Sequence, residues 1–177
     1  MLRTILIYGT VAGLAVGIPL SAMVLTHHSE DSVTGLLIGY TIMLVALSAV
    51  FAGIKRRRDR ELGGVIGFWP ALGLGLGISV VAGVFYVAAW DLALWLTHSD
   101  FAGSYAKAMI AAEKAKGVSG AALQKTAEQW NAWAASYNNP LYRWTETFTE
   151  IFPVGVLVSL VSAGLLCNSR FLPARRG

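Results

Sequence analysis

Charge and cysteine are both scarce in this sequence. Only 14% of its 177 residues are Asp, Glu, Lys or Arg, whereas soluble domains carry nearer a quarter. This low share argues against a soluble globular domain. The single cysteine, Cys167, excludes an intrachain disulfide and leaves the redox compartment undetermined.

Recognisable catalytic motifs are absent as well. The sequence contains no H-E-x-x-H pair, no Walker A loop, no G-x-S-x-G turn and no C-x-x-C pair. We therefore expect a protein that is not an enzyme and that carries no cofactor.

Long uncharged runs are what the sequence has instead. Hydrophobic residues make up 55% of the chain, and its mean hydropathy is +0.58. Residues 33–54 include no charged residue across 22 positions, and residues 62–90 include none across 29. A helix rises about 1.5 Å per residue, so roughly 20 apolar residues cross a bilayer core of about 30 Å. Each run is long enough to span a membrane.

The sequence predicts an all-α membrane protein with four transmembrane helices, over about residues 4–26, 33–54, 68–96 and 147–167. We expect these spans to form a single membrane domain over residues 1–177. The first run also has the basic start of a secretory signal peptide, with Ser21 and Ala22 near a cleavage point. Pro153 lies inside the fourth span and is expected to kink it.

A polar, alanine-rich segment over about residues 98–144 separates the third and fourth spans. Residues 102–116 and 121–137 have helical character, and Ser119 is placed to cap the second helix. Five residues of that second helix form an apolar stripe, namely Leu123, Ala127, Trp130, Ala134 and Tyr137, and Trp133 lies beside it. The stripe is expected to cap the bundle or to lie among lipid headgroups. The alternative is that it covers a cavity or docks a partner.

The distribution of basic residues predicts which side each connection faces. If all four helices cross, one side holds nine Lys and Arg against Asp59 and Glu61, and the other side holds five against eight acids. The positive-inside rule therefore places both termini in the cytoplasm, with the insertion over residues 98–144 extracytoplasmic. The net charge of +4 comes from clusters beside the spans, so we expect no nucleic-acid partner.

The densest basic cluster is the run K-R-R-R-D-R at residues 55–60. We expect its cations to contact anionic lipid headgroups and to fix the topology. A soluble acidic partner is the alternative. The cations concerned are Lys55, Arg56, Arg57, Arg58 and Arg60.

Small residues recur every four positions in the spans, as at Gly9, Gly13 and Gly17. The same spacing is found at Gly35 and Gly39, at Gly73 and Gly77, and at Gly155, Ser159 and Ala163. Such faces let helix backbones approach closely. They predict either packing among the four helices, which we favour, or association into a homo-oligomer.

Glu150 is the sharpest candidate for chemistry. An ionisable group inside a span is costly and usually faces a partner or a water-filled cavity. Asp91 and Tyr86 are expected near the same face, and Arg143 is close enough in sequence to supply a counter-charge. These residues predict either a proton or cation site on the outer side or a structural carboxylate near a helix N-terminus.

The three histidines, His27, His28 and His98, also lie on the predicted outer side. With nearby carboxylates they are a weak candidate for zinc or copper, and we expect no metal site. Cys167 has no histidine on its side of the membrane, so we expect a packed or lipid-facing thiol.

Several segments resemble one family of bacterial membrane proteins. They are F-A-G-I-K-R-R-R-D at 51–59, G-G-V-I-G-F at 63–68, G-L-G-I-S-V-V-A-G-V-F-Y-V at 75–87, Y-N-N-P at 137–140, and T-F-T-E-I-F-P-V-G-V-L-V-S-L at 147–160. Together they are similar to the domain of unknown function 4199 family. This resemblance covers essentially the whole chain, including the first span, which disfavours a cleaved signal peptide. It implies a small integral membrane protein and supplies no activity.

The sequence thus predicts a non-enzymatic structural or accessory inner-membrane protein. The alternative is a small transporter or channel with an acidic outer-side site.

Overall fold

The computed structural model describes residues 1–25 and 32–174, and this part of the chain holds six α-helices and no strand. They are α1 (Leu2–Leu25), α2 (Ser32–Glu61), α3 (Phe68–Thr97), α4 (Phe101–Ala115), α5 (Gly120–Tyr137) and α6 (Pro140–Leu166). Four helices are long and apolar enough to cross a membrane, over Leu2–Met23, Leu37–Glu61, Phe68–Thr97 and Pro140–Leu166. The predicted all-α fold with four apolar spans and a helical insertion is confirmed.

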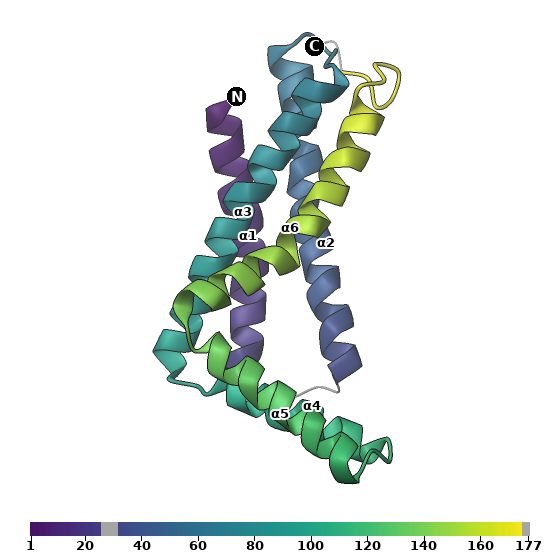
Figure 1. Ribbon diagram of the computed structural model, residues 1–177. Coiled ribbons are helices and arrows are strands. Elements are labelled where there is room, and N and C mark those ends of the chain that lie inside the picture. The colour runs from purple at the N-terminus through teal and green to yellow at the C-terminus, as the bar shows by residue number, and fades with distance from the viewer. Residues whose placement is uncertain (26–31, 175–177) are drawn as a thin grey trace. The chain divides into compact units, whose positions relative to one another are not determined.

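The chain forms two compact units. The first, called here the long-helix unit, comprises Met1–Ala93 and Phe148–Gly177 and contains α1, α2, most of α3 and most of α6. The second, the hairpin unit, comprises Leu94–Thr147 and contains α4 and α5. In the long-helix unit the start of α1 and the end of α6 lie at the same end (Figure 1).

The helix α2 is longer than the predicted span because it includes the whole basic run. Lys55 pairs with Asp59, and Arg57 Nη1 lies 3.2 Å from Glu61 Oε2. Such pairs, four residues apart, stabilise a helix. The chain then leaves α2 at Gly63 and Gly64, which have φ angles of +65° and +92°, values that favour glycine.

The helix α6 begins at Pro140, seven residues before the predicted start at 147. Asn139 precedes it, and its Oδ1 accepts a hydrogen bond from the Leu141 amide at 3.0 Å. Proline suits the first position of a helix because its missing N–H would have no intrahelical partner there. Asn138 and Asn139 turn the chain after α5 and Pro140 begins α6, so the sequence N-N-P is both a turn and a helix start.

The two helices of the hairpin unit are close to their predicted ranges. Asp100 caps α4, with its Oδ1 accepting from the Gly103 amide at 2.9 Å. Ser119 occupies the capping position of α5, but its side chain makes no capping hydrogen bond. The prediction that Ser119 caps this helix was thus right about position and wrong about the hydrogen bond.

Glycines bring α1 close to α3. A Cβ atom added to Gly9 would lie 2.5 Å from Val81 Cβ, and one added to Gly17 would lie 2.5 Å from Ala89 Cβ. Gly13, between them, faces the Ala82 carbonyl in the same way. The small-residue face of α1 therefore packs inside the long-helix unit, as the favoured interpretation predicted.

The helices α3 and α6 meet through a reciprocal pair of small residues. Gly75 of α3 faces Ser159 of α6, and Gly155 of α6 faces Ser79 of α3. The two serine hydroxyls lie 3.2 Å apart and are fully buried. Each hydroxyl also donates to a carbonyl in its own helix, at 3.0 Å for Ser79 and 2.7 Å for Ser159. Both buried hydroxyls therefore have a hydrogen-bond partner, and the backbones approach without leaving either one unsatisfied.

The core of the long-helix unit is apolar and comes from all four helices. Each of the four helices contributes apolar side chains that are 0% exposed. They are Ala12, Val16, Leu47, Val50, Ile54, Leu74, Ile78, Ala82, Ala163 and Leu166.

Candidate functional site

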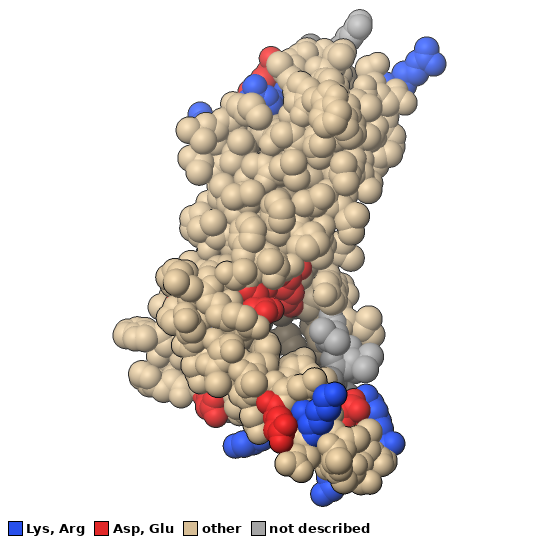
Figure 2. Space-filling model, viewed as in Figure 1, with Lys and Arg blue, Asp and Glu red and all other residues tan. Residues whose placement is uncertain are grey.

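Charged side chains gather at one end of the long-helix unit. This end is formed by the start of α1, the end of α2, the start of α3 and the end of α6 (Figure 1). On the face shown in Figure 2, basic side chains mark this end and a broad band without charged side chains lies next to it. The band agrees with the low charge of the four apolar spans.

Arg58 lies in the middle of the basic run, yet its side chain is fully buried, with 0% exposed. Its Nε donates to Asp59 Oδ1 at 2.7 Å. Its Nη1 donates to the Phe171 carbonyl at 2.9 Å and to the Leu166 carbonyl at 3.4 Å. Its Nη2 donates to the Leu172 carbonyl at 2.5 Å. Arg58 therefore binds the protein's own main chain.

The position of Arg58 has a clear electrostatic reason. The last carbonyls of a helix have no intrahelical partner, and they carry partial negative charge. Leu166 is the last residue of α6, so the Arg58 guanidinium satisfies and neutralises this helix end. It also fastens the segment after α6 to α2.

The other cations of the run divide into two groups. Lys55 pairs with Asp59, and Arg57 pairs with Glu61. Within residues 1–25 and 32–174, no carboxylate forms an ion pair with Arg56 or Arg60. These two side chains are exposed and lie four residues apart on α2, so they project from one face of the helix.

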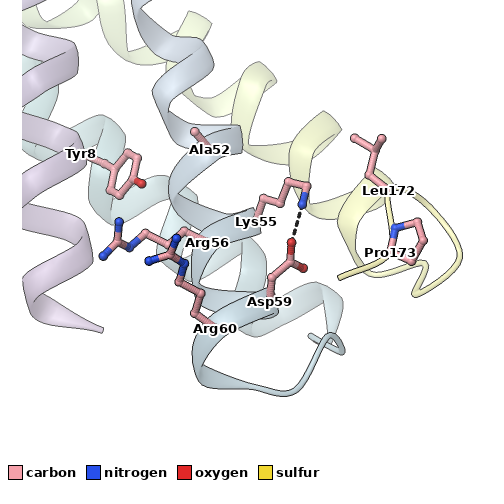
Figure 3. A pocket seen from close by; sticks show the side chains of 8 residues that line it. All are labelled: Tyr8, Ala52, Lys55, Arg56, Asp59, Arg60, Leu172 and Pro173. Atoms are coloured by element: carbon pink, nitrogen blue, oxygen red, sulfur yellow. Dashed lines mark hydrogen bonds and ion pairs between the residues drawn. The ribbon is translucent and has the colours of Figure 1, made fainter. Parts of the chain in front are cut away.

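Arg56 and Arg60 line an open hollow of about 740 Å³ (Figure 3). The remaining lining residues come from α1, α2 and the segment after α6: Tyr8, Ala52, Lys55, Asp59, Leu172 and Pro173. In Figure 3, Arg56 and Arg60 extend on the Tyr8 side of α2, whereas Lys55 and Asp59 extend toward Leu172 and Pro173. Two guanidinium groups beside a phenol suit an anion with several oxygens, such as a phosphodiester.

The predicted role of Lys55, Arg56, Arg57, Arg58 and Arg60 in lipid contact and topology stays a prediction. The structure adds that these cations differ: Arg58 is buried, Lys55 and Arg57 are paired with carboxylates, and Arg56 and Arg60 form no ion pair with a described carboxylate. One signal in the sequence could have identified Arg58: it continues, at helical spacing, the buried stripe of α2 formed by Met43, Leu47, Val50 and Ile54. Sequence reasoning missed it because it treated the run as a connection outside the helix.

The acidic candidate site is only partly assembled. Tyr86 is 3% exposed, and its hydroxyl donates to Glu150 Oε2 at 3.3 Å. Glu150 itself is exposed on α6. Asp91 is half-buried and lies five positions after Tyr86 on α3, or about 7.5 Å along the helix axis.

Arg143 belongs to the hairpin unit, whereas Tyr86, Asp91 and Glu150 belong to the long-helix unit. Its Nη1 donates to the Tyr137 carbonyl at 3.4 Å. The proposed pairing of Arg143 with Glu150 stays a prediction.

The histidine candidates give no metal centre in the part of the chain that the structure describes. No group of three or more His, Cys, Asp or Glu side chains there could hold a metal ion. His27 and His28 lie outside the described residues, and His98 is exposed. Cys167 is exposed, and its thiol donates to the Gly164 carbonyl at 3.1 Å.

The apolar stripe of α5 packs against α4. Tyr105 of α4 lies 5.8 Å from Trp130 and 5.6 Å from Trp133, measured between ring centroids. Tyr137 lies 4.9 Å from Trp133 and 5.9 Å from Phe101. Aromatic rings at these separations attract one another, so these five rings hold the hairpin together.

Comparison with known proteins identifies one family. A family model described as "Protein of unknown function (DUF4199)" matches residues 7–168. No curated protein matches the chain, and no solved structure matches it. The match covers most of α1, all of α2, α3 and α6, and the hairpin of α4 and α5.

Proposed function

The chain belongs to the DUF4199 family of proteins of unknown function, and we propose that it is a non-enzymatic accessory component of a bacterial cytoplasmic membrane. The observation that carries this proposal is the closely packed interior of the long-helix unit. Fully buried apolar side chains from all four helices occupy its centre. A transport route would need polar groups and space for water along the bilayer.

The proposed orientation places the basic end of the long-helix unit in the cytoplasm. The support for it is the positive-inside rule, because Arg3, the run at residues 55–60 and Arg170 all belong to connections on that side. A cytoplasm-active reporter fused after Gly177 should be active in this orientation. A silent reporter would contradict it.

A flux assay in liposomes tests the accessory role. The full chain, reconstituted with a pH-sensitive dye inside the vesicles, should give proton leakage no faster than protein-free vesicles. Reproducible proton flux that depends on the protein would contradict the proposal.

The alternative function is a small transporter or channel. It is favoured by one specific observation, the hydrogen bond from the buried Tyr86 hydroxyl to Glu150 within an apolar span. Under this alternative Glu150→Gln abolishes flux, while Glu128→Gln on the surface of α5 leaves it unchanged. Under the accessory role both variants match the wild-type baseline.

Self-association is also part of the proposal: Gly73 belongs to a small-residue face of α3, and Gly164 lies next to Ala163 of the small-residue face of α6. Gly73 of α3 and Gly164 of α6 are exposed, with open space where a Cβ would stand. A second copy would pack on such faces. Chemical crosslinking in membranes should then give a dimer that Gly73→Leu or Gly164→Leu weakens, and a wild-type chain that gives no crosslinked dimer would end this part of the proposal.

A further inference from the structure

A second hollow is lined by α1 and α2, which also contribute to the hollow around Arg56 and Arg60, called here the basic hollow. It has a volume of about 260 Å³ and is lined by Ala15 and Pro19 of α1 and by Thr41, Ile42, Val45 and Ala46 of α2. Its lining is mostly apolar, in contrast to the basic hollow around Arg56 and Arg60.

Helical periodicity places the two hollows on one face. Tyr8 and Ala15 are seven residues apart on α1, and Val45 and Ala52 are seven residues apart on α2. Seven residues make two turns, so each pair lies on the same side of its helix about 10 Å apart along the axis. Moving away from the basic end, the α1–α2 face therefore changes from cationic to apolar.

We propose that this face binds one anionic glycerophospholipid. The phosphodiester lies between Arg56 and Arg60 in the hollow that Tyr8 also lines, and an acyl chain covers the apolar hollow. The inference rests on the proposed membrane location of the long-helix unit. It goes further, because it assigns one lipid molecule to two particular arginines.

Three observations favour a lipid over other anions. Arg56 and Arg60 are the two cations of the run that no described carboxylate pairs with, so their charge is available to a ligand. A guanidinium group binds phosphate oxygens in a bidentate manner. An acyl chain can occupy the apolar hollow, whereas a small anion cannot use it. Basic pockets between helices at the cytoplasmic side also suit lipid headgroups.

Native mass spectrometry of the full chain in detergent tests the headgroup contact. Phosphatidylglycerol should bind with a stoichiometry of one and phosphatidylcholine should not. The double variant Arg56→Gln/Arg60→Gln should bind phosphatidylglycerol about 25-fold more weakly, since each cation near an anionic lipid strengthens binding about fivefold.

The matched control is Arg3→Gln/Arg170→Gln, which removes two exposed cations outside the hollow. It should bind phosphatidylglycerol like the wild type. Equal weakening by both double variants would overturn the site and indicate a general charge effect.

The apolar hollow gives a second, independent variant. Val45 is 69% exposed, so Val45→Trp fills the hollow without disturbing the core and should weaken phosphatidylglycerol binding. Val161→Trp on α6, where the side chain is 62% exposed, is the control and should have no effect. Unchanged binding in the Val45 variant would overturn the acyl-chain contact.

Inorganic phosphate and glycerol phosphate separate a lipid site from an anion site. Neither should compete with phosphatidylglycerol at millimolar concentration, and full competition would overturn the lipid assignment. The liposome flux assay reports on the accessory role separately, so loss of the lipid site and loss of the proposed function give different results.

Discussion

At the scale of single residues, Arg58 determines how the segment after α6 is held. Its guanidinium donates to three main-chain carbonyls and to Asp59, and it is fully enclosed. Burying a cation costs free energy unless it is paired. Removing the cation costs free energy as well, because its buried partners are then left without a hydrogen-bond donor. The segment after α6 therefore depends on Arg58 for its attachment to α2.

We predict that Arg58→Ala destabilises the protein by about 3 kcal/mol or more, because three carbonyls lose the Arg58 donor and Asp59 keeps only Lys55. Thermal unfolding in detergent measures this loss. Arg60→Ala is the control, since Arg60 is exposed and should change stability by less than about 0.5 kcal/mol. Arg58→Lys should recover only part of the loss, because an ammonium group lacks the planar fork of a guanidinium.

At the scale of elements, the crossing of α3 and α6 depends on glycine. A Cβ atom at residue 155 would lie 2.7 Å from Ser79 Cβ, closer than packed side chains allow. We predict that Gly155→Ala destabilises the protein by about 1–3 kcal/mol in thermal unfolding, because the two helices must move apart.

Gly164 in the same helix is the matched control. It has open space at the position of a Cβ, so Gly164→Ala should leave stability unchanged or raise it by up to about 1 kcal/mol through helix propensity. A Gly155→Ala variant as stable as Gly164→Ala would contradict the packing described for this crossing.

The hairpin of α4 and α5 depends on its aromatic cluster. Trp133 contacts Tyr105, Trp130 and Tyr137, and each such ring pair is worth about 0.5–1.5 kcal/mol. We predict that Trp133→Ala speeds tryptic cleavage after Lys125 in the middle of α5. Trp144→Ala removes an exposed ring and should leave that rate unchanged; equal rates in both variants would count against the cluster.

The elements show where sequence reasoning succeeds and where it stops. The apolar runs predicted α1 and α3 closely, because the length of a membrane span and the lack of charge are local properties. The end of α2 and the start of α6 were missed, since the first depends on pairs such as Lys55–Asp59 and the second on Asn139 before the helix. Helical spacing along α2 could have indicated that Arg58 is buried, but its carbonyl partners lie more than 100 positions away, and spacing within one helix does not identify them.

The candidate site follows the same pattern. Sequence reasoning singled out the basic run and Glu150, and the structure adds the contact between Glu150 and Tyr86. The sequence alone could not show that Arg56 and Arg60 differ from the other cations of the run. That difference depends on which carboxylates and carbonyls Lys55, Arg57 and Arg58 bind.

At the scale of the whole molecule, the four apolar helices and the basic end of the long-helix unit are both features of a membrane protein. The start of α1, the end of α2 and the end of α6 lie at the basic end of the long-helix unit. The hairpin unit belongs to the connection between the third and fourth apolar helices. If all four helices cross the membrane, as we propose, the basic end and the connection between α4 and α5 are expected on opposite sides of it.

Cysteine labelling in intact cells tests this central claim most directly. In a Cys167→Ser background, Ser119→Cys marks the connection between α4 and α5, and Ser169→Cys marks the segment after α6; both serines are exposed. A membrane-impermeant maleimide should label the first variant in intact spheroplasts and the second only after permeabilisation. Labelling of the Ser169 variant in intact spheroplasts, or of neither variant before permeabilisation, would contradict the four-span topology with its basic end in the cytoplasm.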